Sequence, residues 1–117
     1  MDITVYHNPK CGTSRGVLQL LADKGHSPVV IEYLKTPPGR DQLEWMIARM
    51  GVPVREMMRQ KGSPYFELGL DDPKVSDAEL VTHMLAEPIL INRPIVVVGD
   101  QVRLCRPSES VLELIAD

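Results

Sequence analysis

Apolar and polar residues alternate in two different periods along the first third of the chain. The short apolar run at 3–6 predicts a first strand. Residues 15–24 carry apolar side chains at helical spacing and are followed by Gly25, a typical helix stop. The β-branched run at 29–33 predicts a second strand. A strand–helix–strand unit of this length indicates two parallel strands joined by a right-handed crossover.

The middle of the chain shows only helical spacing. Residues 40–50 form an amphipathic pattern that ends at Gly51. Pro53 precedes a short predicted helix at 54–60, and 64–70 can add a further helical turn. The pattern at 76–86 is stronger, because Ser76 and Glu79 have the spacing of a capping box. We therefore expect a helical stretch with no strand in this part of the chain.

The last third returns to the strand period. Residues 95–98 are continuously apolar, Gly99-Asp100 is a hairpin signal, and 102–105 leads back antiparallel. A last helix is predicted from Pro107. The whole order is β-α-β, helices, then β-β-α, which is the thioredoxin-like order. We predict an α/β fold with a small mixed sheet of about four strands and a helical insertion at about 35–88.

Composition narrows the class of protein. At 117 residues, with 44% hydrophobic and 25% charged residues, residues 1–117 are most simply a single domain with its own core. The net charge of −3 argues against a nucleic-acid binder. We see no signal peptide and no apolar run of the roughly 20 residues that span a bilayer. We therefore expect a cytoplasmic protein without a membrane partner.

Two cysteines, Cys11 and Cys105, are too few for a disulfide framework, and no residue spacing predicts a metal site. Cys11 lies in the segment HNPKCGTSR, directly after the first strand and before the first helix. A helix N-terminus stabilises a thiolate and also binds oxyanions. Because small and turn-forming residues flank it, we interpret Cys11 as a reactive thiol rather than a buried hydrophobe. Cys105 alternates with apolar strand neighbours and is interpreted as structural.

The loop excludes two kinds of thiol chemistry. Ser14 stands where a dithiol motif needs its second cysteine, and Val17 stands where a phosphatase loop needs an arginine. Cys11 is therefore a single nucleophile that requires an external thiol for any redox cycle. Gly12, Thr13 and Ser14 can supply N–H and hydroxyl donors around the sulfur, a role compatible with helix capping.

Arginines complete the candidate site. Arg93 precedes the strand at 95–98, where the fold places it opposite the cysteine loop, and Pro94 after it is of a kind often found cis. Arg106 follows the last strand, and two arginines suit a tetrahedral oxyanion. Arg55 and Arg59, four apart on the predicted short helix, share a face, and either can reach the site. Each of these arginines has a plain surface role as its alternative.

His7 precedes the loop and has two interpretations: it can tune the thiolate electrostatically, or it can be a hydrogen-bonding residue of the loop. The residues alone leave these two interpretations open.

Three stretches together resemble the glutathione- and glutaredoxin-dependent arsenate reductase family: HNPKCGTSR at 7–15, ILINRPIVV at 89–97 and RLCRPSE at 103–109. The resemblance covers nearly the whole chain. It implies that Cys11 is the nucleophile and that Arg59, Arg93 and Arg106 bind the anion. It also implies that His7 and Ser14 lower the pKa of the thiol. Gly39 departs from the family, in which a helix-capping serine is frequent at this position.

The resemblance implies reduction of arsenate to arsenite through an arseno-cysteine intermediate, with glutathione as co-substrate, glutaredoxin as partner and no bound cofactor. We expect a monomer. Three alternatives remain. The first is an enzyme, a glutathione-linked thiol oxidoreductase with another substrate. The other two are not enzymes: a regulator of the same fold that binds a protein, and a structural domain with a vestigial site.

Overall fold

The computed structural model describes residues 1–116; residue 117, the last of the predicted domain, lies outside the described residues. A four-stranded sheet has the order β2-β1-β3-β4. Its strands are β1 (Ile3–His7), β2 (Val29–Glu32), β3 (Ile95–Val98) and β4 (Gln101–Leu104). β1 pairs in parallel with β2 and antiparallel with β3, and β3 pairs antiparallel with β4. The predicted mixed sheet and thioredoxin-like α/β class are confirmed.

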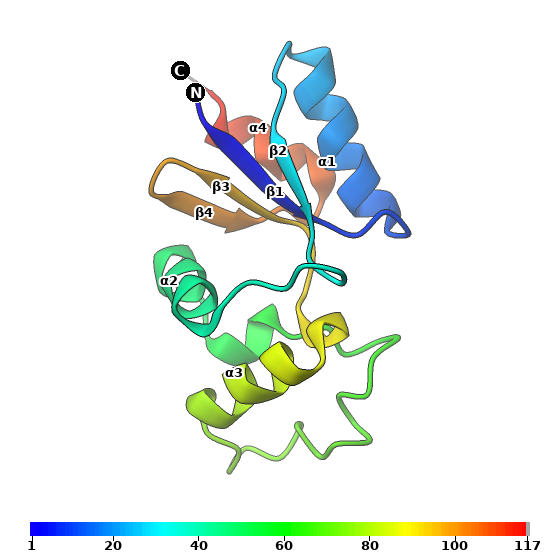
Figure 1. The fold of residues 1–117 in the computed structure, drawn as a ribbon, viewed down its shortest axis with the longest axis vertical. Coiled ribbons are helices and arrows are strands. Elements are labelled where there is room, and N and C mark those ends of the chain that lie inside the picture. Colours follow the sequence, from blue (N-terminus) through cyan, green and yellow to red (C-terminus); the bar gives the residue numbers. More distant parts are fainter. Residues whose placement is uncertain (117) are drawn as a thin grey trace.

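Helices cover both faces of the sheet (Figure 1). On one face lie α1 (Gly12–Asp23), the short helix η3 (Ser108–Ser110) and α4 (Val111–Leu114), which contact one another. On the other lies α2 (Arg40–Met50), which packs against β4, followed by η1 (Val54–Met57), α3 (Asp77–Ala86) and η2 (Pro88–Leu90). Because successive side chains of a strand point to opposite faces of the sheet, each strand contributes residues to two separate cores.

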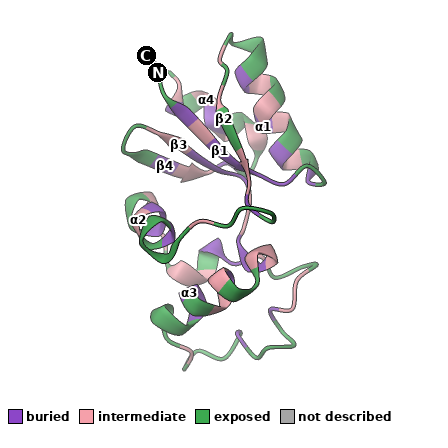
Figure 2. Ribbon diagram, in the orientation of Figure 1, coloured by how far each residue is buried: buried purple, intermediate pink, exposed green. Residues whose placement is uncertain are grey.

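The two cores have different sizes. Ile3, Val5 and Val96 point into the smaller core under α1 and α4. The larger core joins the opposite face of the sheet, through Tyr6 and Ile95, to the helices between β2 and β3. Buried residues consequently follow the strands, whereas the outer sides of α1 and α2 are exposed (Figure 2).

Local signals set most helix ends. Gly25, at φ +81°, donates its N–H to Ala22 while His26 donates to Leu21, the two hydrogen bonds of a Schellman motif. Ser76 and Glu79 form the predicted capping box. Gly39 is the N-cap of α2 and supplies no side-chain cap. Helix α1 begins at Gly12, three residues before the predicted start, with Cys11 as its N-cap.

Three predicted helical segments differ in the structure. The helix at 54–60 is a 3₁₀ turn that ends at Met57, because Met58 forms a β-bridge with Ile91 instead. Residues 64–70 are turns, in which the bond from Leu68 N to Pro64 O has the α-helical spacing and the bond from Gly69 N to Phe66 O has the 3₁₀ spacing. After Pro107, a 3₁₀ turn precedes the short α4. Within residues 1–116, no helix is long and apolar enough to cross a membrane.

Candidate active site

The cysteine loop is wrapped around Asn8, which is buried at the end of β1. Its carbonyl accepts a hydrogen bond from the N–H of Cys11 at 3.0 Å, and its side-chain oxygen accepts one from Lys10 N at 3.0 Å. Its own N–H donates to Ser14 Oγ at 3.1 Å. The second of these bonds is an Asx turn, which fixes a short loop locally. The chain is therefore turned so that Cys11 caps helix α1.

Cys11 is only 8% exposed, and the pKa of its thiol is lowered. Burial acts in the opposite direction and raises the pKa, but four interactions outweigh it. The backbone N–H groups of Ser14 and Thr13 lower the pKa, Arg93 lowers it through its charge, and Arg106 donates to the sulfur from 3.7 Å. All four favour the thiolate, which is the nucleophilic form.

His7 and Ser14 are both buried and in contact. Nδ1 of His7 lies 2.6 Å from Ser14 Oγ. Burial lowers the pKa of His7, Glu32 raises it and Arg15 lowers it, so the net direction is down and the ring stays neutral at pH 7. A neutral His7 acts on the thiol through Ser14, whose position it fixes. Of the two interpretations from the sequence, the geometry favours the hydrogen-bonding one.

Arg93 and Arg106 reach the sulfur because β3 and β4 are antiparallel neighbours. Arg93, two residues before β3, and Arg106, two residues after β4, then lie at the same end of the hairpin. Arg106 Nη1 donates to the Arg93 carbonyl at 3.1 Å as well as facing Cys11 Sγ. The Arg93–Pro94 peptide bond is cis, as the sequence suggested, and the Arg106–Pro107 bond is also cis.

Arg59 is placed near Arg93 by backbone hydrogen bonds and not by the β3–β4 hairpin. It lies beyond η1, so the prediction that Arg55 and Arg59 share a helix face is wrong. Arg59 N donates to Leu90 O at 2.7 Å, and Asn92 N donates to Met57 O at 2.8 Å. These bonds and the Met58–Ile91 bridge place Arg59 beside the segment that carries Arg93.

The two candidate arginines of this region have different partners. The Arg55 guanidinium donates to the carbonyls of Leu70, Asp72 and Val75 and to the Tyr65 hydroxyl, which holds the 64–75 loop in place. Arg59 donates through Nε to Lys61 O at 2.8 Å and keeps its terminal nitrogens available. Between the two, the geometry favours Arg59 as the anion ligand.

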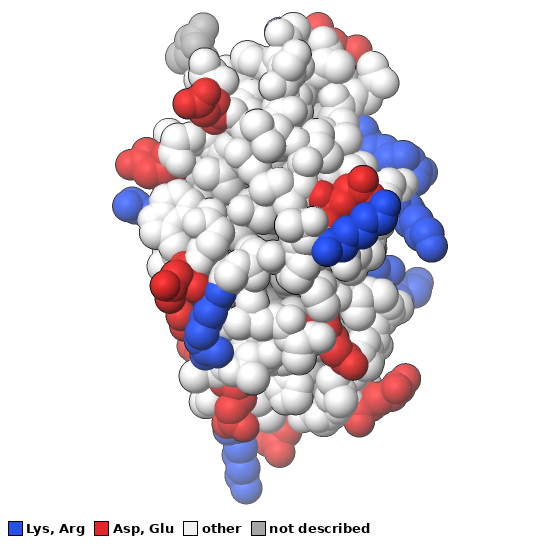
Figure 3. Space-filling view, in the orientation of Figure 1, with Lys and Arg blue, Asp and Glu red and all other residues white. Residues whose placement is uncertain are grey.

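One pocket, of about 680 Å³, is lined by Arg59, Arg93 and Arg106 together. Nε of Arg93 is buried and has no hydrogen-bond partner among residues 1–116. A buried donor without a partner is costly, so a site of this kind is completed by an acceptor ligand. Lys and Arg side chains gather on the right-hand edge of Figure 3, at the height of the β1–α1 loop in Figure 1. The arrangement suits a tetrahedral oxyanion next to the thiolate.

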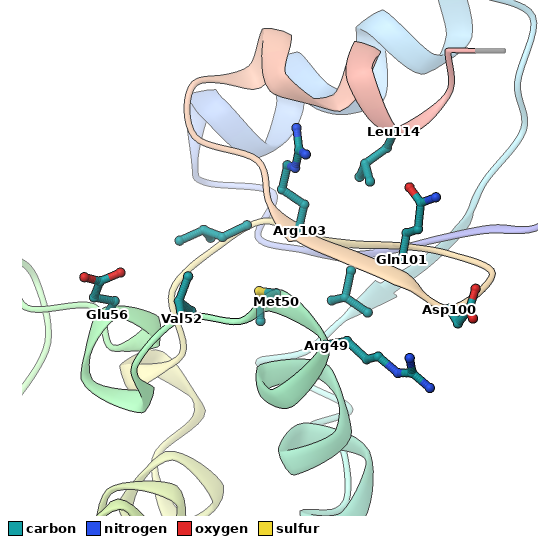
Figure 4. A pocket seen from close by; sticks show the side chains of 10 residues that line it. Arg49, Met50, Val52, Glu56, Asp100, Gln101, Arg103 and Leu114 are labelled. Carbon is teal, nitrogen blue, oxygen red and sulfur yellow. The ribbon is translucent and has the colours of Figure 1, made fainter.

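A second pocket, of about 550 Å³, lies along β4 between the end of α2 and α4 (Figure 4). Arg103 in its wall is already paired with Glu113. The pocket lined by Arg59, Arg93 and Arg106, the arginine pocket, is instead linked to the thiol, because Arg106 Nη1 lies 3.7 Å from Cys11 Sγ. We therefore place the chemistry in the arginine pocket. Cys105 belongs to the smaller core, where burial raises the pKa of its thiol to about 11, so it stays protonated and inert at pH 7.

Three residues that shape the site were not predicted from the sequence. Asn8 belongs to the segment HNPKCGTSR, and an asparagine two residues before Lys10 in a loop is a sequence signal for an Asx turn. Tyr33 carries no sequence signal: its hydroxyl, buried beside Asn8, donates to Ile91 O at 3.3 Å and so joins the cysteine loop to the Arg93 segment. Ser108 donates to Thr13 O at 2.8 Å, which joins α1 to the chain after Arg106. By contrast, the N–H of Gly12, a predicted donor, is not among the groups that act on the sulfur.

A thioredoxin-like fold with one activated cysteine beside an arginine-lined anion pocket defines a class: single-cysteine thiol enzymes that act on an oxyanion. Within that class, the chain belongs to the ArsC family, whose profile matches residues 6–114.

Relatives with high identity carry one name. An arsenate reductase of Rhizobium meliloti is 56% identical over 117 residues, which is all of this chain and 84% of the relative. An arsenate reductase of Escherichia coli strain K12 is 53% identical over 116 residues, or 99% of this chain and 82% of the relative. Among solved structures, an arsenate reductase from Vibrio cholerae superposes with a TM-score of 0.94 at 46% identity, covering 98% of each chain.

Proposed function

We propose that the Cys11 thiolate attacks the arsenic of an arsenate held by Arg59, Arg93 and Arg106, and that glutathione and glutaredoxin complete the reduction. That the chain is an oxidoreductase of the arsenate reductase kind follows from its family and from relatives above 50% identity over nearly its full length. The residue roles and the thiol partners are the proposal. The observation that carries it is the lowered pKa of Cys11 with Arg106 Nη1 at 3.7 Å from the sulfur.

The first step forms the bond between sulfur and arsenic. The thiolate donates its electron pair to arsenic, and one arsenate oxygen leaves as water after taking up two protons. Guanidinium groups offset the charge of the oxyanion and polarise its arsenic–oxygen bonds. Because they are permanently charged, they do so without changing their own protonation.

The later steps consume two external thiols. Glutathione condenses on the arseno-cysteine adduct, forming a second arsenic–sulfur bond and releasing a second water. A glutaredoxin thiolate then attacks the glutathione sulfur. The new disulfide is the oxidised product, while the electron pair of the broken bond stays on arsenic and reduces it by two electrons. Water finally cleaves the bond to Cys11 and releases arsenite and the free thiol. Ser14, in place of a second loop cysteine, is the reason why these thiols come from outside.

Turnover of arsenate in the presence of glutathione and glutaredoxin tests the proposal, with Cys11→Ser beside Cys105→Ala. We expect Cys11→Ser to abolish turnover, and Cys105→Ala to retain it because Cys105 is protonated and lies in the core. Full activity of Cys11→Ser would overturn the mechanism. Turnover with arsenate but without any dependence on glutathione would overturn the choice of thiol. Sedimentation of the same samples tests the expectation of a monomer.

A further inference from the structure

The arginine pocket is several times larger than the oxyanion it is proposed to hold. A tetrahedral oxyanion occupies the room of roughly three water molecules, on the order of 100 Å³ at about 30 Å³ per water. The pocket has about 680 Å³, which is the size of pockets that accept molecules as large as a tripeptide. The space next to the arsenate site is therefore sufficient for the second reactant.

The lining of this extra space has an uncommitted cation. Five basic side chains and one carboxylate line the pocket: Arg55, Arg59, Lys61, Arg93, Arg106 and Glu56. Three arginines serve the oxyanion, and Arg55 is bonded to loop carbonyls. Lys61 remains. Its side chain is exposed and pairs with no carboxylate among residues 1–116.

The position of Lys61 is fixed by Arg59. Its carbonyl accepts from Arg59 Nε, and the next residue, Gly62, lies directly under the same guanidinium. A Cβ on Gly62 would be 2.7 Å from Arg59 Nη2. The backbone of Lys61 is thus held against Arg59, one of the proposed anion-binding arginines, and both Lys61 and its neighbour Gln60 line the pocket.

We propose that Gln60 and Lys61 form a carboxylate subsite for glutathione, the thiol that attacks the arsenic on Cys11. This rests on the proposed function. Glutathione is a tripeptide thiol with two carboxylates, and an ammonium group and an amide are the donors that such groups bind in a partly exposed site. Lys61 recognises the co-substrate and takes no part in the chemistry of arsenic.

Steady-state kinetics of the full chain with saturating arsenate test the subsite, with glutathione or the uncharged thiol 2-mercaptoethanol as reductant. Lys61→Met is compared with Lys61→Arg and with Lys74→Met, a change of another exposed lysine that does not line the pocket. An exposed ion pair corresponds to a change of about two- to five-fold in affinity. We expect Lys61→Met to raise the KM for glutathione by that factor, and the effect to shrink at high salt. Lys61→Arg should restore the KM, and Lys74→Met should not change it.

The outcomes separate the two proposals. An unchanged glutathione KM in Lys61→Met, with normal wild-type turnover, would overturn the subsite and leave the proposed function standing. An equal loss with 2-mercaptoethanol would also overturn it, because that thiol has no carboxylate. Wild-type protein that shows no turnover with glutathione would instead overturn the proposed function, and the subsite with it.

Discussion

Gly16 in α1 packs against the segment that follows Arg106, and its replacement by alanine gives a prediction whose sign the structure reverses. From sequence alone, glycine to alanine inside a helix stabilises by about 1 kcal/mol. In the fold, a Cβ at this position would be 2.6 Å from Ser108 Oγ and 3.2 Å from Ser108 Cβ. Ser108 cannot give way without loss, because its hydroxyl donates to Thr13 O at 2.8 Å.

The expected magnitude follows from three contributions. Overpacking costs about 1–3 kcal/mol, and loss of the hydrogen bond costs about 0.5–1.5 kcal/mol. The helix propensity of alanine offsets about 1 kcal/mol of this. Gly16→Ala should therefore lower the free energy of unfolding by about 2 kcal/mol, measured by urea denaturation followed by circular dichroism.

A double-mutant cycle isolates the contact. Ser108→Ala removes the hydroxyl that the new methyl group meets, so Gly16→Ala should cost less in that background, by about 1 kcal/mol or more. A Gly16→Ala protein as stable as wild type, or additive effects in the cycle, would refute the reasoning that α1 and the Arg106 segment are in close contact at this point.

Three further predictions concern the site itself. Arg106→Gln removes a donor to the sulfur, so the pKa of Cys11 should rise and the pH profile of its alkylation by iodoacetamide should move to higher pH; an unmoved profile would exclude this contact. Ser14→Ala leaves His7 Nδ1 and Asn8 N without a buried partner and should destabilise by about 1–3 kcal/mol in chemical denaturation; a change below about 0.5 kcal/mol would contradict the network. Gly62→Ala should raise the KM for arsenate by displacing Arg59, whereas Gly69→Ala, at a similar positive φ with no atom within 4 Å, has the same backbone strain and should not; equal effects of the two changes would show that Arg59 is not involved.

Local signals explain what the sequence could predict of the fold. The C-terminal end of α1 and the N-terminal end of α3 were predictable, because Gly25 and the Ser76–Glu79 pair act on residues close to them in the sequence. The prediction of a helix at 54–60 was wrong because this segment depends on a contact with a residue far away in the sequence. Its second half pairs with Ile91, which is distant in sequence, and long-range pairing overrides local propensity. That residues 1–117 form one domain stays a prediction.

The same division applies to the site. The strand order alone brings Arg93 and Arg106 to Cys11. The proximity of these three residues was therefore predictable from the sequence. The separation of Arg55 from Arg59 was not predictable, because it depends on which carbonyls the 64–75 loop presents. The role of Tyr33 was equally unpredictable, because it consists of contacts with two segments that are distant in the sequence.

X-ray absorption spectroscopy at the arsenic edge, on protein incubated with arsenate, shows directly whether Cys11 forms a bond to arsenic. We predict an arsenic–sulfur bond in the wild-type protein and in Cys105→Ala, and only arsenic–oxygen bonds in Cys11→Ser. An arsenic–sulfur bond that persists in Cys11→Ser, or that is lost in Cys105→Ala while the protein remains folded, would contradict it.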